Sequence, residues 1–260
     1  MVNLYPEVVA EGGLEAAYLQ RAPGLKFLST VGTGPIQGLW SNGNTGYVVS
    51  GQQFYSVTAA GVPTLIGTVT NTGPVSMADN GTQLFIAADP KGYIYNFDTN
   101  VLAEITDEDF AGSNTVAYLD GYFVFSEPNS QRIWVTTLFD GVGLVANHRE
   151  VRVFGTNSTE VWYNSGDADF PLARIQGAYN EVGCVAPNSI AKLDNSIVWL
   201  GQDARGRGIV YRANGYRAQR ISTHAVEFAI QSYADMTDAV AYSYQQDGHE
   251  FYVLNVPLAD

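Results

Sequence analysis

A short unit of strands repeats along this chain, and the repetition limits the folds that the chain can adopt. Each copy has an apolar strand, a turn of Asp, Asn or Gly, a second apolar strand, a loop, and a strand built on Trp or Tyr; the clearest copies span residues 115–126 and 189–200. The second strands are predicted to begin at six positions that lie 29 to 55 residues apart, with a mean step of 41: Tyr47, Leu84, Tyr122, Val151, Ile197 and Tyr252. A period of about 40 residues is typical of a stacked or radial array of units.

The turns and the aromatic strands indicate antiparallel hairpins. Asp120-Gly121 and Asp247-Gly248 lie between apolar runs, where a two-residue turn needs residues that tolerate positive φ, and Asp194-Asn195 is a weaker version of the same signal. The aromatic strands are residues 54–55, 93–95, 133–135, 161–163 and 209–211. Four-stranded units at this spacing form the blades of a propeller around a central channel. We therefore predict an all-β fold, a β-propeller with six blades of antiparallel sheets.

A β-sandwich is the alternative, because it also contains short strands at regular spacing. The constant place of the aromatic strand in each pair of hairpins favours the propeller, and Trp134, Trp162 and Trp199 are expected at matching places between blades. Only two short segments, 14–19 and 223–231, show the helical spacing of apolar residues. The length fits a single domain over 1–260, whose N-terminal segment 1–36 can complete an otherwise incomplete last blade.

The composition argues against several functions. A net charge of −13, from 26 acidic and 13 basic residues, is unsuited to a surface that grips DNA or anionic lipid. No run of 18 apolar residues and no basic region before an apolar stretch is present, so neither membrane insertion nor a secretory signal is predicted. The single cysteine, Cys184, excludes an intrachain disulfide and is expected to be a buried structural thiol.

The basic residues gather in one interval, which contains Arg205, Arg207, Arg212, Arg217 and Arg220. Solvated charge explains this group, but on a common face it can also meet an acidic partner, including another copy of this acidic chain. Arg205, Arg207, Tyr216 and Arg217 are therefore the candidate contacts with a partner. The intervals 139–147 and 216–238 are candidate insertions for the same purpose.

The residues that catalysis or metal binding would need do not form a recognisable set. The three histidines, His148, His224 and His249, lie far apart and lack metal-ligand spacing; exposed hairpin positions and a cap on the short helix account for them. The carboxylates of 107–109 and 167–169 are the candidates for a glycosidase pair, but they lie in loops where acidic residues usually solvate a turn. Nucleophile-elbow, phosphate-loop and dinucleotide motifs are absent. We predict no catalytic, metal-binding or cofactor-binding residue and no enzyme activity; the alternative is a propeller that binds carbohydrate or acts on glycans.

Three stretches of the sequence carry a resemblance to a known family. They are 2–7 with 19–25, where an Asn-bearing strand precedes a Pro-Gly turn; 151–163, with its Phe-Gly-x-x-Ser hairpin; and 175–187 followed by 221–228. In their order these stretches resemble the packaged-DNA stabilisation proteins of short-tailed bacteriophages, also described as tail hub, nozzle or tail accessory proteins. Members of that family usually continue past the point that corresponds to 254–260, so their C-terminal extension is expected to be missing here.

The resemblance implies a structural role in the virion. Several copies, six by family analogy, would form a ring below the portal and adaptor rings, continue the DNA channel, and hold the tail plug or needle and the fibres or spikes. DNA would pass through without sequence-specific binding, and assembly would take place in the host cytoplasm. No cofactor is implied.

Overall fold

The computed structural model describes residues 4–8, 17–21, 24, 26–108, 110–130, 132–136, 150–167, 170–204, 206–246 and 248–257, with backbone only for the first two ranges. Antiparallel sheets dominate these residues, which confirms the prediction of an all-β fold. Among them, no helix has the length and apolar character that a bilayer span requires.

Two four-stranded meanders, blades 1 and 2, begin the main body. Blade 1 contains β3 (Ile36–Asn42), β4 (Thr45–Ser50), β5 (Gln53–Thr58) and β6 (Pro63–Thr68). Blade 2 contains β7 (Ser76–Asp79), β8 (Gln83–Ala88), β9 (Lys91–Asn96) and β10 (Val101–Glu104). In both blades each strand pairs with the next strand along the chain, as the hairpin signals predict.

Two three-stranded sheets, blades 3 and 4, follow. Blade 3 contains β11 (Val116–Leu119), β12 (Tyr122–Ser126) and β13 (Ile133–Val135). Blade 4 contains β14 (Glu150–Phe154), β15 (Thr159–Asn164) and β16 (Leu172–Asn180). The turn between β11 and β12 has positive φ at both Asp120 (47°) and Gly121 (95°), which confirms the predicted two-residue turn.

The remaining strands form blades 5 and 6. Blade 5 contains β17 (Gly183–Cys184), β18 (Ala191–Leu193), β19 (Ser196–Asp203), β20 (Gly206–Asn214) and β21 (Arg217–Arg220), with the 3-10 turn η1 (Pro187–Ser189) between β17 and β18. The helix α1 (His224–Gln231) then leads to blade 6, the hairpin of β22 (Val240–Gln246) and β23 (His249–Asn255). The helix confirms the prediction for 223–231, and Thr223, not His224, occupies its N-cap position.

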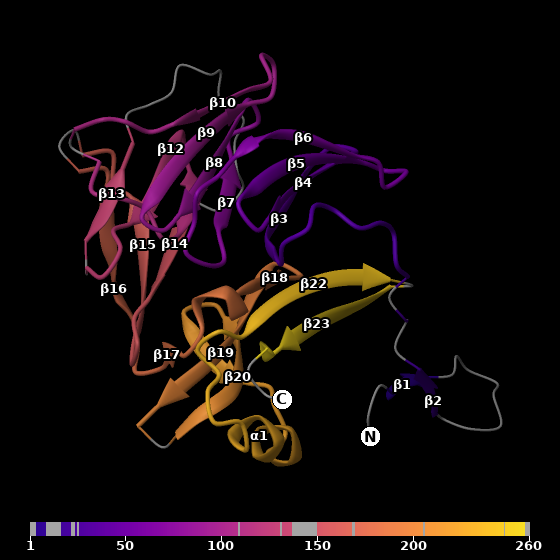
Figure 1. The fold of residues 1–260 in the computed structure, drawn as a ribbon. Coiled ribbons are helices and arrows are strands. Elements are labelled where there is room, and N and C mark those ends of the chain that lie inside the picture. Colours follow the sequence, from indigo (N-terminus) through magenta and orange to yellow (C-terminus); the bar gives the residue numbers. More distant parts are fainter. Residues whose placement is uncertain are drawn as a thin grey trace.

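The six sheets follow one another around a centre in chain order, from blade 1 at the upper right of Figure 1 to blade 6 below it. The first strand of each sheet, or β18 in blade 5, lines a common central cavity. This arrangement fits the six predicted blades, and it excludes two sheets packed face to face.

The hydrophobic core lies in the seams between neighbouring blades. Five apolar clusters join blades 1 to 2, 2 to 3, 3 to 4, 4 to 5 and 5 to 6 in turn. Phe54, Phe85 and Phe123 are fully buried in these seams, and each such side chain contributes about 1.5–3 kcal/mol through burial. Within the described residues none of the clusters joins blade 6 to blade 1, where Ile36 and Leu39 of β3 are exposed.

The repeat was assigned wrongly in one blade. Val151 lies on β14, the first strand of the described part of its sheet, and the aromatic strand of 161–163 belongs to the second strand, β15. The three tryptophans consequently do not occupy matching places. In the spatial order of their sheets, Trp134 lies on the third strand, β13, while Trp162 and Trp199 lie on the second strands, β15 and β19. Each nevertheless packs in a seam between neighbouring blades, as expected.

The N-terminal residues form a separate hairpin, β1 (Leu4–Val8) and β2 (Ala17–Arg21), which stands apart from the six sheets (Figure 1). Residues 17–19 are therefore in a strand, and the helix predicted over 14–19 is wrong there. Further along, Leu28 lies beside Gly61 of the β5–β6 turn: a Cβ at Gly61 would be 3.0 Å from Leu28 Cγ. Within the described residues β22 and β23 pair only with each other, so completion of the last blade by residues 1–36 stays a prediction.

Candidate functional site

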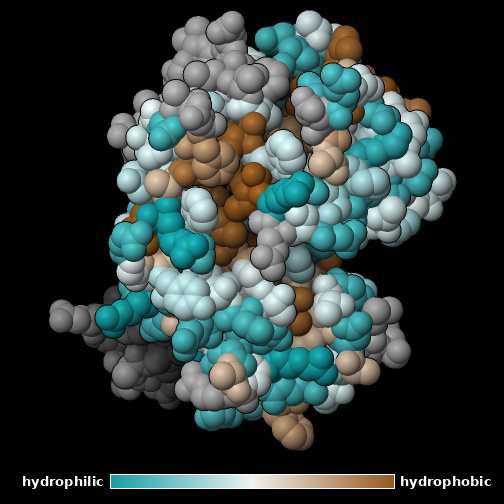
Figure 2. All heavy atoms as spheres, turned by 90° about the vertical axis from the view of Figure 1, so that its left-hand side faces the viewer, coloured by the Kyte–Doolittle hydropathy of each residue, from teal (hydrophilic) through white to brown (hydrophobic). Residues whose placement is uncertain are grey.

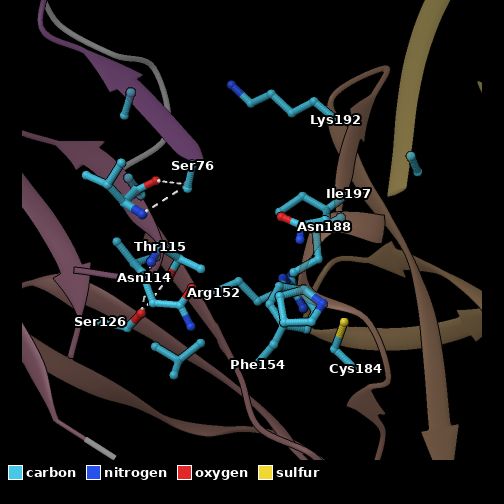
Figure 3. A pocket seen from close by; sticks show the side chains of 18 of the residues that line it. Ser76, Asn114, Thr115, Ser126, Arg152, Phe154, Cys184, Asn188, Lys192 and Ile197 are labelled. Carbon is cyan, nitrogen blue, oxygen red and sulfur yellow. Dashed lines mark hydrogen bonds between the residues drawn. The ribbon is translucent and has the colours of Figure 1, made fainter. Parts of the chain in front are cut away.

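The central cavity has a volume of about 2040 Å³. Side chains from blades 2 and 3, such as Ser76 and Thr115, face Asn188, Lys192 and Ile197 of blade 5 across it (Figure 3). Figure 2 views the molecule from the side of β13 and β16 and shows apolar side chains in a hollow with hydrophilic borders. The first strands thus present to the cavity a mixed wall of small polar and apolar groups.

The small polar groups of this wall bond to neighbouring strands. Ser76 Oγ on β7 accepts a hydrogen bond from the Val116 N–H (3.1 Å) and donates one to the Val116 carbonyl (3.5 Å), so it links blade 2 to blade 3. Thr115 Oγ1 and Ser126 Oγ lie 2.8 Å apart within blade 3. The dashed lines in Figure 3 mark such contacts. These hydroxyl groups therefore stabilise the wall.

The charged groups of the cavity wall are mixed in sign. Three basic residues, Arg152, Lys192 and Arg207, accompany four acidic residues, Asp79, Glu127, Glu150 and Asp194. Whether the acidic residues of this chain face a channel was not visible from the sequence. The structure shows that the axial wall of one propeller is close to balanced and not strongly acidic.

Each of the four carboxylates has a partner within the described structure. Trp40 Nε1 donates to Asp79 at 2.5 Å, and Trp134 Nε1 donates to Glu127 at 3.0 Å. The Tyr216 hydroxyl donates to Glu150 at 2.7 Å, and Arg212 Nη2 lies 2.9 Å from Asp194 Oδ2. A glycosidase needs two carboxylates that converge on one substrate bond, whereas these four hold separate parts of the wall together.

Arg152 is a partly buried charge at the junction of blades 4 and 5. Its Nη2 donates to the Gly215 carbonyl at 2.8 Å, while its buried Nη1 has no hydrogen-bond partner among the described residues. Burial lowers the pKa of Arg152, and the nearby Glu150 and Tyr216 act in the opposite direction. The contacts tie β14 to the β20–β21 turn, and sequence reasoning missed them because the two segments lie about 60 residues apart.

The predicted partner contacts lie at different places in the described structure or outside it. Arg205 lies outside the described residues. Arg207 lines the cavity and accepts a hydrogen bond from Gln231 at its carbonyl, and Arg217 is exposed on β21. Tyr216 bonds within the chain, to Glu150 through its hydroxyl and to the Asn180 side chain through its carbonyl. A partner-contact role for these residues stays a prediction.

Arg220 and Glu227 form a pair that the sequence did not reveal. The Glu227 side chain is only 5% exposed, and it accepts hydrogen bonds from Arg220 and, at 2.6 Å, from Ser222 Oγ. The hydrogen bond from Arg220 holds the pKa of Glu227 below its usual value. The pair fastens the start of α1 to the end of β21, which is a structural task.

The other candidate residues are also structural or lie outside the described residues. Cys184 is half-buried, its thiol donates to the Ala186 carbonyl, and burial raises its pKa to about 11. His224 is exposed on α1, and the ring of His249 lies 6.5 Å from that of Phe251 in a tilted arrangement, while His148 lies outside the described residues. Residues 109 and 169 of the two acidic loops also lie outside them. Among the described residues, no group of three or more His, Cys, Asp or Glu side chains is placed to hold a metal ion.

The fold and the cavity together define a β-propeller whose described axial wall holds structural polar groups. A family model described as "Bacteriophage P22 Gp10, beta-propeller" matches residues 1–259. The chain therefore belongs to this family of phage DNA-stabilisation proteins, which confirms the resemblance drawn from the three sequence stretches. The family consists of structural phage proteins, so the prediction of a non-enzymatic protein is confirmed as well.

Solved structures support the fold alone. The extracellular domain of the one-component system BT4673 from B. thetaiotaomicron is 12% identical, with a TM-score of 0.51, and the match covers 84% of this chain and 31% of that one. A chain of the mitotic checkpoint complex is 13% identical, with a TM-score of 0.46, over 72% of this chain and 65% of that one. The chain thus spans less than two thirds of either structure. Virginiamycin B lyase from Staphylococcus aureus is 11% identical, with a TM-score of 0.41, over 84% and 91% of the two chains. None of the curated protein sequences matches this chain.

Proposed function

We propose that this protein forms a ring in the tail of a short-tailed phage, below the portal and adaptor rings. The family match over residues 1–259 carries the proposal, since it makes the chain a structural phage protein. In this role several copies, six by family analogy, continue the DNA channel, keep packaged DNA inside, and hold the plug or needle and the fibres or spikes. The protein is assembled in the host cytoplasm and resides in the virion.

The dimensions of the cavity favour a DNA path between the copies rather than through one propeller. Spread over one duplex turn of about 34 Å, a cavity of 2040 Å³ has a cross-section of about 60 Å². A circle of that area is about 9 Å across, which is less than the width of the major groove alone, about 12 Å. The duplex would therefore run along the axis of the ring. The net charge of −13 fits this path, because phosphates are not retained by a surface with few clustered cations.

The engaged carboxylates of the cavity wall favour this structural role over the carbohydrate alternative. A sugar site needs polar groups that are free to turn toward a ligand. In this wall Asp79, Glu127, Glu150 and Asp194 are each held by another side chain.

Measurement of the mass of the assembly tests the proposal. Light scattering and negative-stain imaging are applied to the protein alone and to its mixture with a portal–adaptor complex. A glycan array measures carbohydrate binding and so tests the alternative function. We expect ring-shaped particles or binding to the complex, and no glycan affinity. A protein that does not bind the portal–adaptor complex and does bind a glycan would contradict the proposal.

A further inference from the structure

Within the described residues, blade 6 has an unpaired strand edge on its outer side. Two described strands form it, whereas blades 1 and 2 contain four, and β22 lines the cavity, so β23 is the outer strand. Gln246 and His249 flank the two-residue turn and therefore form a hydrogen-bonded pair. Because such pairs alternate along an antiparallel ladder, the N–H groups of Glu250, Tyr252 and Leu254 point away from β22. Within the described part of the chain, no hydrogen bond outside that ladder occupies them.

A groove of about 680 Å³ lies along this part of the molecule; its surface is mixed, although most of the residues that line it are apolar. Its wall includes Leu254 of β23, Val210 of β20, and Val226 and Ile230 of α1. Val226 is 48% exposed although it faces this groove. A further strand paired with β23 would place alternate side chains over these residues, as added strands do when they extend a sheet edge.

The N-terminal hairpin has the two strands by which blade 6, within the described residues, falls short of blades 1 and 2. Within the described residues, β1 and β2 pair only with each other, over five residue pairs, and they stand apart from the propeller (Figure 1). Pro6 on β1 has no N–H group, so the outer edge of β1 is poorly suited to pairing, and β2 offers the complete edge. Addition of β2 to β23 gives the order β22-β23-β2-β1. This sheet has four strands, as blades 1 and 2 have, and ends in a proline-bearing strand of the kind that blunts exposed edges.

We propose that the hairpin of one copy docks on blade 6 of a neighbouring copy, where β2 pairs with β23 and covers the groove. The inference rests on the proposed ring. Among the described residues, each copy carries a hairpin and a strand edge that pair with no further strand, and head-to-tail contacts between two such features generate rings when the rotation closes. The hairpin has the reach for this exchange, because the seven residues from Arg21 to Leu28, which lies beside Gly61, extend up to about 25 Å.

Cross-linking between two singly substituted copies tests the exchange directly. A copy with Gln20→Cys is mixed with a copy with Glu250→Cys and treated with a short bis-maleimide at neutral pH. Cys184 reacts slowly in both copies, because burial raises its pKa to about 11. We expect a linked species of twice 28.1 kDa. Deletion of residues 1–21 from the Glu250→Cys copy should leave the yield of the linked product unchanged. Val226→Glu in that copy should lower this yield by at least nine tenths.

Phe228 supplies the matched control on the same helix. It is 78% exposed on α1 and does not line the groove, so Phe228→Glu adds the same charge and should leave the yield unchanged. Circular dichroism and the melting temperature confirm that both variants fold. A variant that carries both Gln20→Cys and Glu250→Cys shows whether the link forms within one chain or between chains. The inference is wrong if the mixed single-cysteine copies do not cross-link, if Val226→Glu and Phe228→Glu behave alike, or if this double variant links only within its own chain. If rings still form, these results contradict only the hairpin exchange and not the proposed function. The proposed function is overturned if the unmodified protein neither forms rings nor binds the portal–adaptor complex.

Discussion

The Tyr216 hydroxyl donates a hydrogen bond to Glu150 Oε1 at 2.7 Å, which joins the β20–β21 turn of blade 5 to the first strand of blade 4. The two residues lie 66 positions apart in the chain. The hydrogen bond to Glu150 raises the pKa of Tyr216 above its usual value, since the bond favours the protonated phenol. Tyr216, which the sequence analysis predicted to contact a partner, thus contributes to the contact between blades 4 and 5 within one chain.

Tyr216→Phe separates these two roles. Because the hydroxyl group is exposed to solvent, its loss should lower the midpoint of urea unfolding only slightly. The mass of the assembly should stay that of the unmodified protein. A variant with an unchanged unfolding midpoint and a lower assembly mass would show that Tyr216 contacts a partner.

Phe85 tests the seam between blades 2 and 3. Its ring lies 5.5 Å from that of Phe123, and both side chains are fully buried. Phe85→Ala should lower the free energy of unfolding by about 3–5 kcal/mol, because it removes buried apolar surface and leaves a cavity. Phe27 is 76% exposed, so Phe27→Ala is the control and should change the value by less than about 0.5 kcal/mol. Equal effects in denaturant titrations would mean that the core does not lie in the seam.

Gly183 allows β17 to approach the β14–β15 turn closely. A Cβ at this position would lie 2.0 Å from the Thr156 carbonyl oxygen, and the Gly183 carbonyl also accepts a hydrogen bond from Trp199 Nε1 at 3.1 Å. Gly183→Ala should therefore destabilise the protein by about 1–3 kcal/mol or more, since backbone has to move. Gly206→Ala is the matched control, because no atom lies within 4 Å of the added Cβ. Melting temperatures of the two variants that agree within error would contradict this packing.

The Arg220–Glu227 pair makes stability depend on pH in the acidic range. The folded-state pKa of Glu227 is depressed below its usual value of 4.5 by the hydrogen bond from Arg220, so its contribution to stability is present above pH 4.5 and is lost as the pH falls through the lower, folded-state pKa. Glu227→Gln should lower the melting temperature at pH 7 by a few degrees and flatten the loss of stability below pH 4.5. The same acid profile in both proteins would show that the pair does not contribute.

Cys184 should react slowly with thiol reagents. Burial raises the pKa of its thiol to about 11, and only the thiolate reacts. The rate of maleimide modification in the folded protein should rise about tenfold per pH unit from pH 7 to pH 9 and remain far below that of the unfolded chain. Rates that are equal in the two states would mean that the thiol is not buried.

Local signals in the sequence predicted the local structure well. Asp120-Gly121 requires only the backbone preferences of two adjacent residues, and the structure has positive φ at both. The helix over 223–231 was visible for a similar reason. The prediction for Val151 was wrong because the steps between successive repeats range from 29 to 55 residues, so that a mean period does not identify which strand of a blade a residue begins.

The contacts of the candidate site could not be predicted from the sequence. Arg152 forms a hydrogen bond with Gly215, and Tyr216 forms one with Glu150, only because blades 4 and 5 are neighbours in space. Arg220 and Glu227 lie seven residues apart, across the end of a strand and the start of a helix, so neither strand nor helix periodicity brings them together. The groove beside β23 likewise could not be predicted, because its wall forms only where α1 packs.

The mass of the native assembly, measured by light scattering with and without a portal–adaptor complex, tests the central claim most directly. The account predicts a ring of several copies of the 28.1 kDa chain, six by family analogy, or a stable complex with the portal–adaptor rings. A protein that remains a single 28.1 kDa copy at all concentrations and does not bind those rings would contradict it.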